Sequence, residues 1–150
     1  MIKTHLKAIA TLSFAFFLFS CSISRNQTPS RIGLVALKNY SLVNPNSVQD
    51  TAYMAIQNET DFSSTFTGAE KLDLYGKTAV AIILKNDASL KFDSADYIGS
   101  SVNVYAQTCS AASQPQCATG KVFLATIPKV GSAKTVHFFI NNNKLGSIKL

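Results

Sequence analysis

Few side chains in this 150-residue sequence have types and spacing suited to chemistry, and the histidine is the first to consider. After the N-terminal segment the chain holds a single histidine, His137, next to Phe138 and Phe139 in an apolar run of strand length. A catalytic triad or a zinc site would need that residue as its base or ligand. The sequence contains no G-x-S-x-G, no H-E-x-x-H and no glycine-rich phosphate loop. We therefore expect no catalytic residue, no metal site and no cofactor.

The carboxylates do not form a recognisable site in the sequence. The pairs Glu59/Asp61 and Asp93/Asp96 stand in polar, turn-like stretches, where acidic residues usually cap helices or shape turns. The segment Asp93-Ser94-Ala95-Asp96 offers too few oxygen ligands for a dedicated calcium loop. A glycosidase-like carboxylate pair that meets only in the folded protein stays open, because the separation it requires is spatial.

The N-terminal segment has the composition of an export signal. Lys3 and Lys7 precede an uncharged run from Ala8 to Phe19 that contains four phenylalanines. A helix that crosses a bilayer needs roughly 20 apolar residues, and this run has about a dozen. We therefore predict a signal peptide over residues 1–20 rather than a permanent membrane span.

The signal ends in Leu18-Phe19-Ser20-Cys21, which resembles the lipobox of bacterial lipoproteins. The resemblance covers residues 1–21 and implies that Cys21 receives a diacylglyceryl thioether and becomes the first residue of the mature chain. Ser22, in the position where aspartate tends to retain such proteins in the inner membrane, implies the outer membrane. The face of that membrane stays open. Ordinary secretion, with cleavage after Ser22 or Ser24, is the alternative.

The number of cysteines favours lipidation over ordinary secretion. Cysteines tend to pair in an oxidising compartment, and the exported chain carries three. Cys109 and Cys117 are close in sequence and can form a disulfide, which leaves Cys21 as the odd thiol. Seven residues separate Cys109 from Cys117, a spacing that suits neither a redox pair nor a zinc site.

The segment between the paired cysteines, Ser110 to Gln116, is a polar loop that a disulfide would pin. We interpret the strands on either side of it, Val102–Thr108 and Lys121–Ile127, as a pair joined by this loop. A rigid exposed loop is also a common docking element. The predicted binding residues are Ser110, Gln114, Pro115 and Gln116.

Charge and composition separate a tether from a folded part. Residues 21–30 are polar and contain Pro29, as expected of a tether, and residues 31–150 have the length of a single domain.

Lys3 and Lys7 leave with the signal, so twelve of the 14 basic residues remain against eight acidic ones, a net charge of +4. These basic residues are scattered, whereas a nucleic-acid-binding surface needs a basic stripe. We therefore expect no nucleic-acid partner.

The domain is predicted to be mainly β, a small antiparallel β-sandwich of seven or eight strands. Short apolar or alternating runs are separated by turn signals, which is typical of that architecture. The predicted strands are Arg31–Asn39, Thr51–Asn58, Thr78–Leu84, Leu90–Phe92, Ser101–Thr108, Lys121–Ile127, Thr135–Ile140 and Leu145–Leu150.

Turns and a helix complete the predicted fold. Asn86-Asp87 is predicted to end the strand before it, and the asparagines from Asn141 suit a tight hairpin because asparagine tolerates positive φ. A short helical segment is predicted near residues 60–70, with Asp61 as its cap.

The folded part weakly resembles the small sandwich lipoproteins of type VI secretion membrane complexes (the TssJ family). The similarity lies in the order of a first strand at Leu34–Lys38, the turn Asn44-Pro45-Asn46, a strand at Ala52–Gln57 and then Asp61-Phe62. It implies an envelope protein that binds a protein partner through loops of the sandwich, as an assembly component. An inhibitor of lysozyme or protease and a surface-exposed adhesin or antigen are the alternatives.

Overall fold

The computed structural model describes residues 27–110 and 114–150. The predicted signal peptide, Cys21 and most of the predicted tether lie outside the described residues. In chain order the elements are β1 (Ser30–Ile32), β2 (Val35–Leu37), β3 (Tyr40–Leu42), the 3-10 turn η1 (Pro45–Ser47), β4 (Ala52–Ile56), α1 (Glu59–Thr65), β5 (Phe66–Gly68), β6 (Lys77–Ile98), β7 (Ser101–Thr108), β8 (Ala118–Pro128), β9 (Thr135–Ile140) and β10 (Asn143–Lys149).

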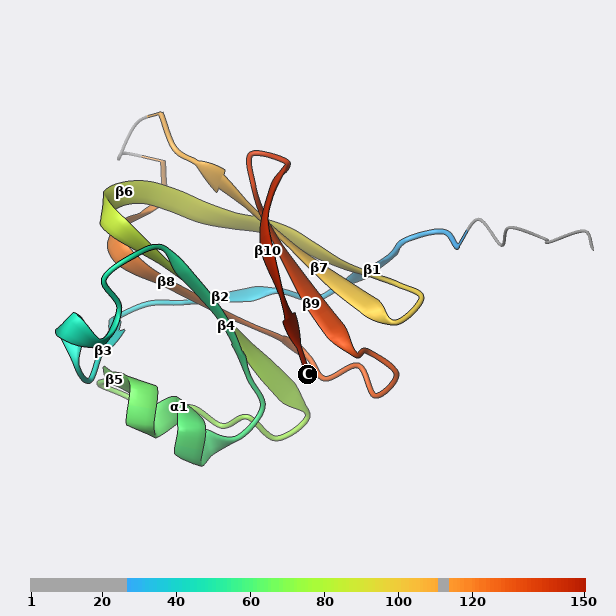
Figure 1. Cartoon of the computed structure of the whole chain (residues 1–150), viewed down its shortest axis with the longest axis horizontal. Helices are drawn as coiled ribbons and strands as arrows, with labels where there is room; N and C mark the ends of the chain where they lie inside the picture. Colours follow the sequence, from blue (N-terminus) through green and yellow to red (C-terminus); the bar gives the residue numbers. More distant parts are fainter. Residues whose placement is uncertain (1–26, 111–113) are drawn as a thin grey trace, which may run out of the picture.

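Strand β6 runs through both layers of a small β-sandwich. Its first part, residues 77–83, pairs with β4 on one side and β8 on the other, and β2 extends this layer beyond β8. Its last part, residues 90–98, pairs with β7, and β9 and β10 follow in order. Figure 1 shows β6 bending between the two parts, so that the eight-stranded sheet folds over on itself. The predicted mainly β sandwich is confirmed.

The bend of β6 lies where the sequence analysis placed the end of a strand. The pairing of β6 with β8 shifts register between Ile83 and Ala88, and the residues between them include exposed Lys85, Asn86 and Asp87. The backbone stays extended because Ala88 and Ser89 pair again with β8. The prediction that Asn86-Asp87 ends the strand was therefore wrong.

The main core fills the space between the two layers. Val80 and Ile82 of β6 meet Phe123 of β8 on one side, and Val104 of β7 and Phe138 of β9 on the other, all in one buried cluster. In β7 and β9 the buried side chains alternate with less buried ones, because successive residues of a strand point to opposite faces. The alternation in Ser101–Thr108 and Thr135–Ile140 predicted β7 and β9 correctly.

A second cluster covers the other face of the first layer. Ala79, Ala81 and Ile83 point away from the main core and pack with Phe62 of α1 and Phe66 of β5. Both faces of β6 are therefore buried over residues 78–83, which explains why this segment is a continuous apolar run. The predicted helical segment is confirmed as α1, which lies across this face with the β3–β5 pair (Figure 1).

The cap of α1 differs from the predicted one. Asn58, not Asp61, is the N-cap: its side-chain oxygen accepts from the Asp61 backbone N–H at 2.8 Å. The Asp61 carboxylate in turn accepts from the Asn58 amide at 2.6 Å. The two side chains satisfy each other, and an asparagine at this position serves the helix start as well as an aspartate would.

One strand pair corrects the prediction of an antiparallel sandwich. Strands β7 and β9 are parallel, with Val104 opposite Phe138, while the other pairs are antiparallel. The chain leaves β7, passes through β8 in the opposite layer and returns to the edge of β7, so it can run in the same direction again. Parallel neighbours require such a long crossover.

The first strand of the sequence prediction is divided between the layers. Residues 30–32 pair with β6 in the second layer and residues 35–37 pair with β8 in the first layer. Gly33-Leu34 carries the chain across, so Arg31–Asn39 is two strands rather than one. Within the described residues no helix is long and apolar enough to cross a membrane.

Candidate functional site

The predicted disulfide joins Cys109 to Cys117, with 6.3 Å between their Cα atoms. Cys109 follows β7 and Cys117 precedes β8, but these two strands do not pair with each other. They flank β6 on opposite sides, so the predicted hairpin of Val102–Thr108 with Lys121–Ile127 was wrong. The cystine is instead a strap that crosses β6 just after its bend.

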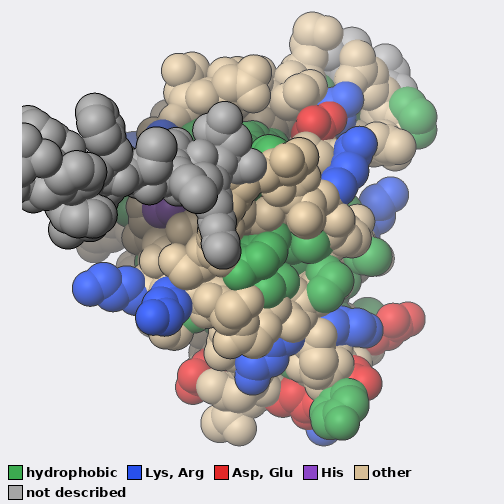
Figure 2. All heavy atoms as spheres, turned by 90° about the vertical axis from the view of Figure 1, so that its right-hand side faces the viewer, with side chains coloured by type: hydrophobic (Ala, Val, Ile, Leu, Met, Phe, Trp, Pro, Cys, Tyr) green, Lys and Arg blue, Asp and Glu red, His purple; other side chains and the backbone are tan. Residues whose placement is uncertain are grey.

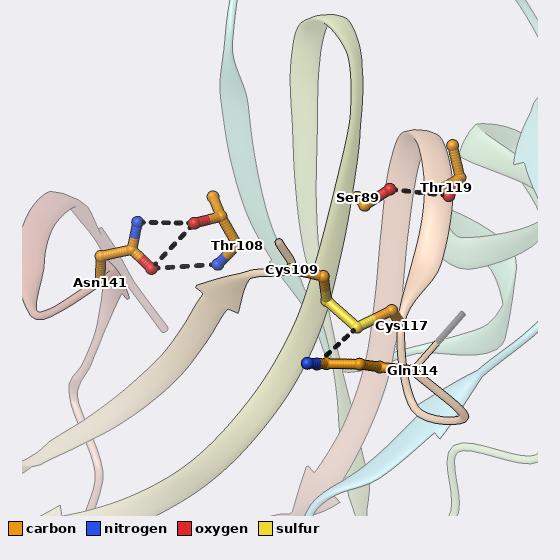
Figure 3. The surroundings of a disulfide bond; sticks show 7 residues. All are labelled: Ser89, Thr108, Cys109, Gln114, Cys117, Thr119 and Asn141. Carbon is orange, nitrogen blue, oxygen red and sulfur yellow. Dashed lines mark hydrogen bonds between the residues drawn. A yellow bond between two sulfur atoms is a disulfide. The ribbon is translucent and has the colours of Figure 1, made fainter. Parts of the chain in front are cut away.

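Hydrogen bonds fix both ends of this strap to β6. The Cys109 backbone N–H donates to the Ser89 carbonyl at 2.9 Å. The Ser89 hydroxyl lies 2.8 Å from that of Thr119, its partner in β8 (Figure 3). Ser89 is therefore held from both sides at the point that the cystine spans.

Asn141 adds a clamp from the β9–β10 turn, which sequence reasoning predicted only as a hairpin. Its side-chain oxygen accepts from the Thr108 backbone N–H at 3.0 Å, and its amide donates to the Thr108 hydroxyl at 2.9 Å (Figure 3). Asn141 and Asn142 have φ values of 51° and 64°, which confirms the predicted positive-φ turn. Asn141 thus fixes the residue that directly precedes Cys109.

The predicted binding residues lie around this fixed point. Ser110, Gln114, Pro115 and Gln116 are all exposed, and the Cys117 N–H donates to the Gln114 carbonyl at 3.0 Å, closing a turn before the second cysteine. The Gln114 side-chain oxygen is 3.5 Å from the Cys117 sulfur, a contact rather than a hydrogen bond, because a disulfide sulfur carries no proton.

The exposed groups of this loop are neutral. No charged residue stands between Cys109 and Cys117, and the described Ser110, Gln114 and Gln116 offer hydroxyl and amide donors and acceptors next to the cystine. Such groups suit hydrogen bonding to the surface of another protein.

His137 lies away from the cystine, on the outward side of β9. Its Nδ1 is 2.9 Å from the hydroxyl of Ser147, its partner in β10. Burial lowers the pKa of His137 below the ordinary value, and the nearby Lys144 lowers it further. The neutral ring joins two neighbouring strands at this position.

The same outward side carries an aromatic pair. Tyr105 and Phe139 stack with 5.0 Å between ring centroids, and burial followed by the charge of Asp96 raises the pKa of Tyr105. Asp96 accepts from the Asn103 amide at 2.7 Å. These contacts link β6, β7 and β9 side by side.

The carboxylates of the predicted pairs have local partners. Glu59 forms an ion pair with Lys71 at 3.2 Å, Asp61 accepts from Asn58, and Asp96 accepts from Asn103. In residues 27–110 and 114–150, His, Cys, Asp and Glu form no group of three or more with metal-binding geometry.

The cystine and the start of the described chain lie at opposite ends of the sandwich (Figure 1). At one end, which we call the proximal end, the Gln27 side chain lies against Gly99 in the β6–β7 turn. At the other, the cystine end, lie Cys109, Cys117 and Asn141. The eight residues of β7 connect the two ends, a distance of about 26 Å at ~3.3 Å per residue.

Neither the family models, the curated proteins nor the solved structures include a match to this chain.

Proposed function

We propose that this chain is a lipid-anchored lipoprotein of the bacterial outer membrane, and that it acts by binding a protein partner as an assembly component of an envelope complex. The lipobox-like Leu18-Phe19-Ser20-Cys21 supports the anchor. The observation that carries the binding role is the position of the cystine loop. It lies about 26 Å from the end at which the chain enters the sandwich.

This position bears on function because the anchor orients the domain. Lipid on Cys21 would hold the proximal end towards the membrane, since Gln27 lies there and only a short segment precedes it. The cystine loop would then point away from the bilayer, towards other envelope proteins. The cystine fixes the two ends of this neutral loop to each other, which lowers the conformational freedom that binding would have to remove and favours a specific contact.

The anchor is tested by the chemistry of Cys21. We expect the mature N-terminal peptide to begin at Cys21 and to carry the mass of a diacylglyceryl group. Cys21→Ser should move the protein from the membrane fraction to the soluble fraction. A membrane-bound Cys21→Ser protein, or a Cys21 peptide without lipid, would show that the anchor is wrong.

The binding role is tested by photo-crosslinking in the intact envelope. A photo-reactive amino acid in place of exposed Gln116 should capture one defined protein, and the same group in place of exposed Ser132 at the proximal end should not. Absence of a specific product from Gln116 would contradict the binding loop.

The same experiment separates assembly from the alternative functions. An envelope protein in the Gln116 product supports the assembly component. Capture of lysozyme or a protease, together with inhibition of that enzyme by the purified protein, would replace it with an inhibitor. Capture of a host surface protein would replace it with an adhesin.

A further inference from the structure

The proximal end brings together three loops and the C-terminus through backbone hydrogen bonds. The Lys129 N–H donates to the Gly76 carbonyl at 2.8 Å, and the Lys134 N–H donates to the Ser100 carbonyl at 2.7 Å. The Lys134 carbonyl accepts from the Leu150 N–H at 3.0 Å. The turn before β6, the β6–β7 turn and the β8–β9 loop therefore form one continuous surface beside Gln27.

A large, strongly exposed side chain with an apolar ring, that of Tyr75, belongs to this surface. Tyr75 is 91 % exposed, and its backbone N–H donates to the Asp73 carboxylate at 2.8 Å, which fixes the turn that presents it. Beside it, a groove of about 290 Å³ is lined partly by Pro128 and by Val35, which is 62 % exposed. A tyrosine in this setting offers an apolar ring and a polar hydroxyl to whatever covers it.

Exposed lysines lie on the same end of the domain, and two of them, Lys77 and Lys129, line hollows that Tyr75 also lines. Lys77, Lys129 and Lys134 are exposed, and none of the three is in an ion pair within the described residues. Figure 2 faces this end and shows an area of hydrophobic side chains with Lys and Arg on several sides of it, and with Asp and Glu side chains towards the lower edge of the view.

Two acidic residues of the described chain lie near Tyr75. Asp73 accepts from its backbone N–H. Glu59 lines a neighbouring hollow with Tyr75 and Lys129 and is in an ion pair with Lys71. The surface therefore combines an aromatic ring with three lysines that have no ion pair within the described residues, against one such carboxylate, that of Asp73, near the ring.

The chain before the described residues limits what can lie opposite this surface. Five residues separate Cys21 from Gln27, and a fully extended chain between the two reaches about 20 Å. A lipid on Cys21 therefore keeps Gln27, and with it the β6–β7 turn, within about that distance of the bilayer. Tyrosine side chains suit the headgroup region of a bilayer, and lysines suit anionic headgroups. Together with the short connection to the anchor, they indicate that the bilayer surface lies opposite this end.

We propose that the proximal end rests on the anionic headgroup surface of the bilayer, with Tyr75 inserted among the headgroups, Lys77 and Lys129 beside it, and Lys134 on the same end. This inference rests on the lipid anchor of the proposed function. It adds that the domain is held by its own surface in a fixed orientation, with the cystine end outward. A domain tethered by lipid alone would rotate freely on its tether.

The absence of tryptophan from the sequence makes a direct test possible. Tyr75→Trp places a single tryptophan, which can be excited apart from the tyrosines, in the proximal surface, and Gln116→Trp places one on the cystine loop as the matched control. Both are made in the full-length lipidated protein, which is reconstituted in phosphatidylcholine vesicles with and without phosphatidylglycerol.

We expect the tryptophan of Tyr75→Trp to shift its emission to the blue and to be quenched by brominated lipid in the anionic vesicles. The tryptophan of Gln116→Trp should stay water-like in both. Adding Lys129→Glu and Lys134→Glu to Tyr75→Trp should reduce the quenching, because each lysine near an anionic surface changes the partition constant by a factor of about five. Adding Lys121→Glu, exposed in β8, should not. Water-like emission from Tyr75→Trp in the anionic vesicles would overturn the proposal.

Two independent readouts separate this inference from the anchor. Flotation of the vesicles and the mass of the Cys21 peptide report the anchor, whereas quenching reports the surface contact. A lipidated protein that floats with an unquenched tryptophan overturns the surface contact alone. A protein without lipid that does not float overturns both.

Discussion

The Tyr53 phenol lies across the backbone of Gly146, in the space where the Cβ of any other residue would stand. Tyr53 belongs to β4 and Gly146 to β10, and each of these strands has a single strand neighbour, β6 and β9 respectively. The Tyr53 ring is also 5.5 Å from that of Phe138. Gly146 therefore allows the edges of the two layers to meet over the core.

Gly146→Ala should destabilise the protein, because the new methyl group overlaps the Tyr53 ring. We expect a loss of about 1–3 kcal/mol in the free energy of unfolding, as for other overpacked sites. Urea unfolding measures it. Gly131→Ala is the matched control, because a Cβ there meets no atom within 4 Å. In a Tyr53→Leu background the Gly146→Ala cost should fall, and an unchanged cost would exclude the ring as its cause.

Removing the cystine should lower stability without changing the sandwich. Replacing Cys109 and Cys117 together by serine opens a loop with a sequence separation of 8, and the chain-entropy model gives a loss of about 2–3 kcal/mol. The measurement is the urea midpoint of the variant against that of the oxidised protein. Oxidised protein treated with a reducing agent should unfold at the midpoint of the variant. Equal midpoints for variant and oxidised protein would mean that the strap adds no stability.

Replacing Asn141 should lower the stability of the protein more than replacing Asn142, although both residues have positive φ. Asn141→Gly keeps the turn but removes the bonds to Thr108, so we expect a loss of about 1 kcal/mol. Asn142→Gly should change stability by less than about 0.5 kcal/mol, since its side chain has no hydrogen bond of this kind within the described residues. Thermal unfolding of the two glycine variants makes the comparison, and identical melting temperatures would contradict the clamp.

The lowered pKa of His137 predicts a loss of stability in mild acid. Burial keeps the folded ring neutral below the pH at which the unfolded ring takes up a proton. The unfolded state therefore binds more protons in the window below the ordinary pKa of about 6.5, and stability falls as pH falls through it. Above pH about 6.5 the His137 ring is mostly neutral in both the folded and the unfolded state, so its titration no longer lowers the free energy of unfolding.

His137→Gln removes this titration and keeps a side chain that can bond to Ser147. From about pH 7.5 to about pH 5.5, the melting temperature of the parent protein should fall further than that of His137→Gln. The difference isolates His137, because the carboxylates titrate in both proteins. Parallel decreases would rule out the histidine as the cause.

The elements that the sequence predicts best are those whose pattern reflects one buried face. Strands β7 and β9 have the predicted bounds, Ser101–Thr108 and Thr135–Ile140. Their inward side chains alternate with outward polar or aromatic ones, so the period of two is visible in the sequence. The turn at Asn141 and Asn142 was likewise predictable, because it requires positive φ and asparagine tolerates positive φ.

Strand partners were harder to predict, because pairing depends on distant residues. Nothing local in Val102–Thr108 or Lys121–Ile127 shows that both pair with β6 rather than with each other. Asn86-Asp87 has turn composition, yet β6 continues because Ala88 and Ser89 find partners in β8. The pairing of Cys109 with Cys117 was predictable from spacing, whereas the Ser89 and Asn141 contacts around it arise only when three strands and a turn meet.

A single strand that belongs to both layers also determines how this domain can unfold. Residues 77–83 and 90–98 of β6 are covalently continuous, and each pairs on both of its sides. Releasing either layer exposes one half of β6 and with it the core shared by Val80 and Val104. Partial opening that spares one layer is therefore unfavourable. Backbone amides in the two halves of β6 should exchange with solvent at similar rates, through the same global unfolding event.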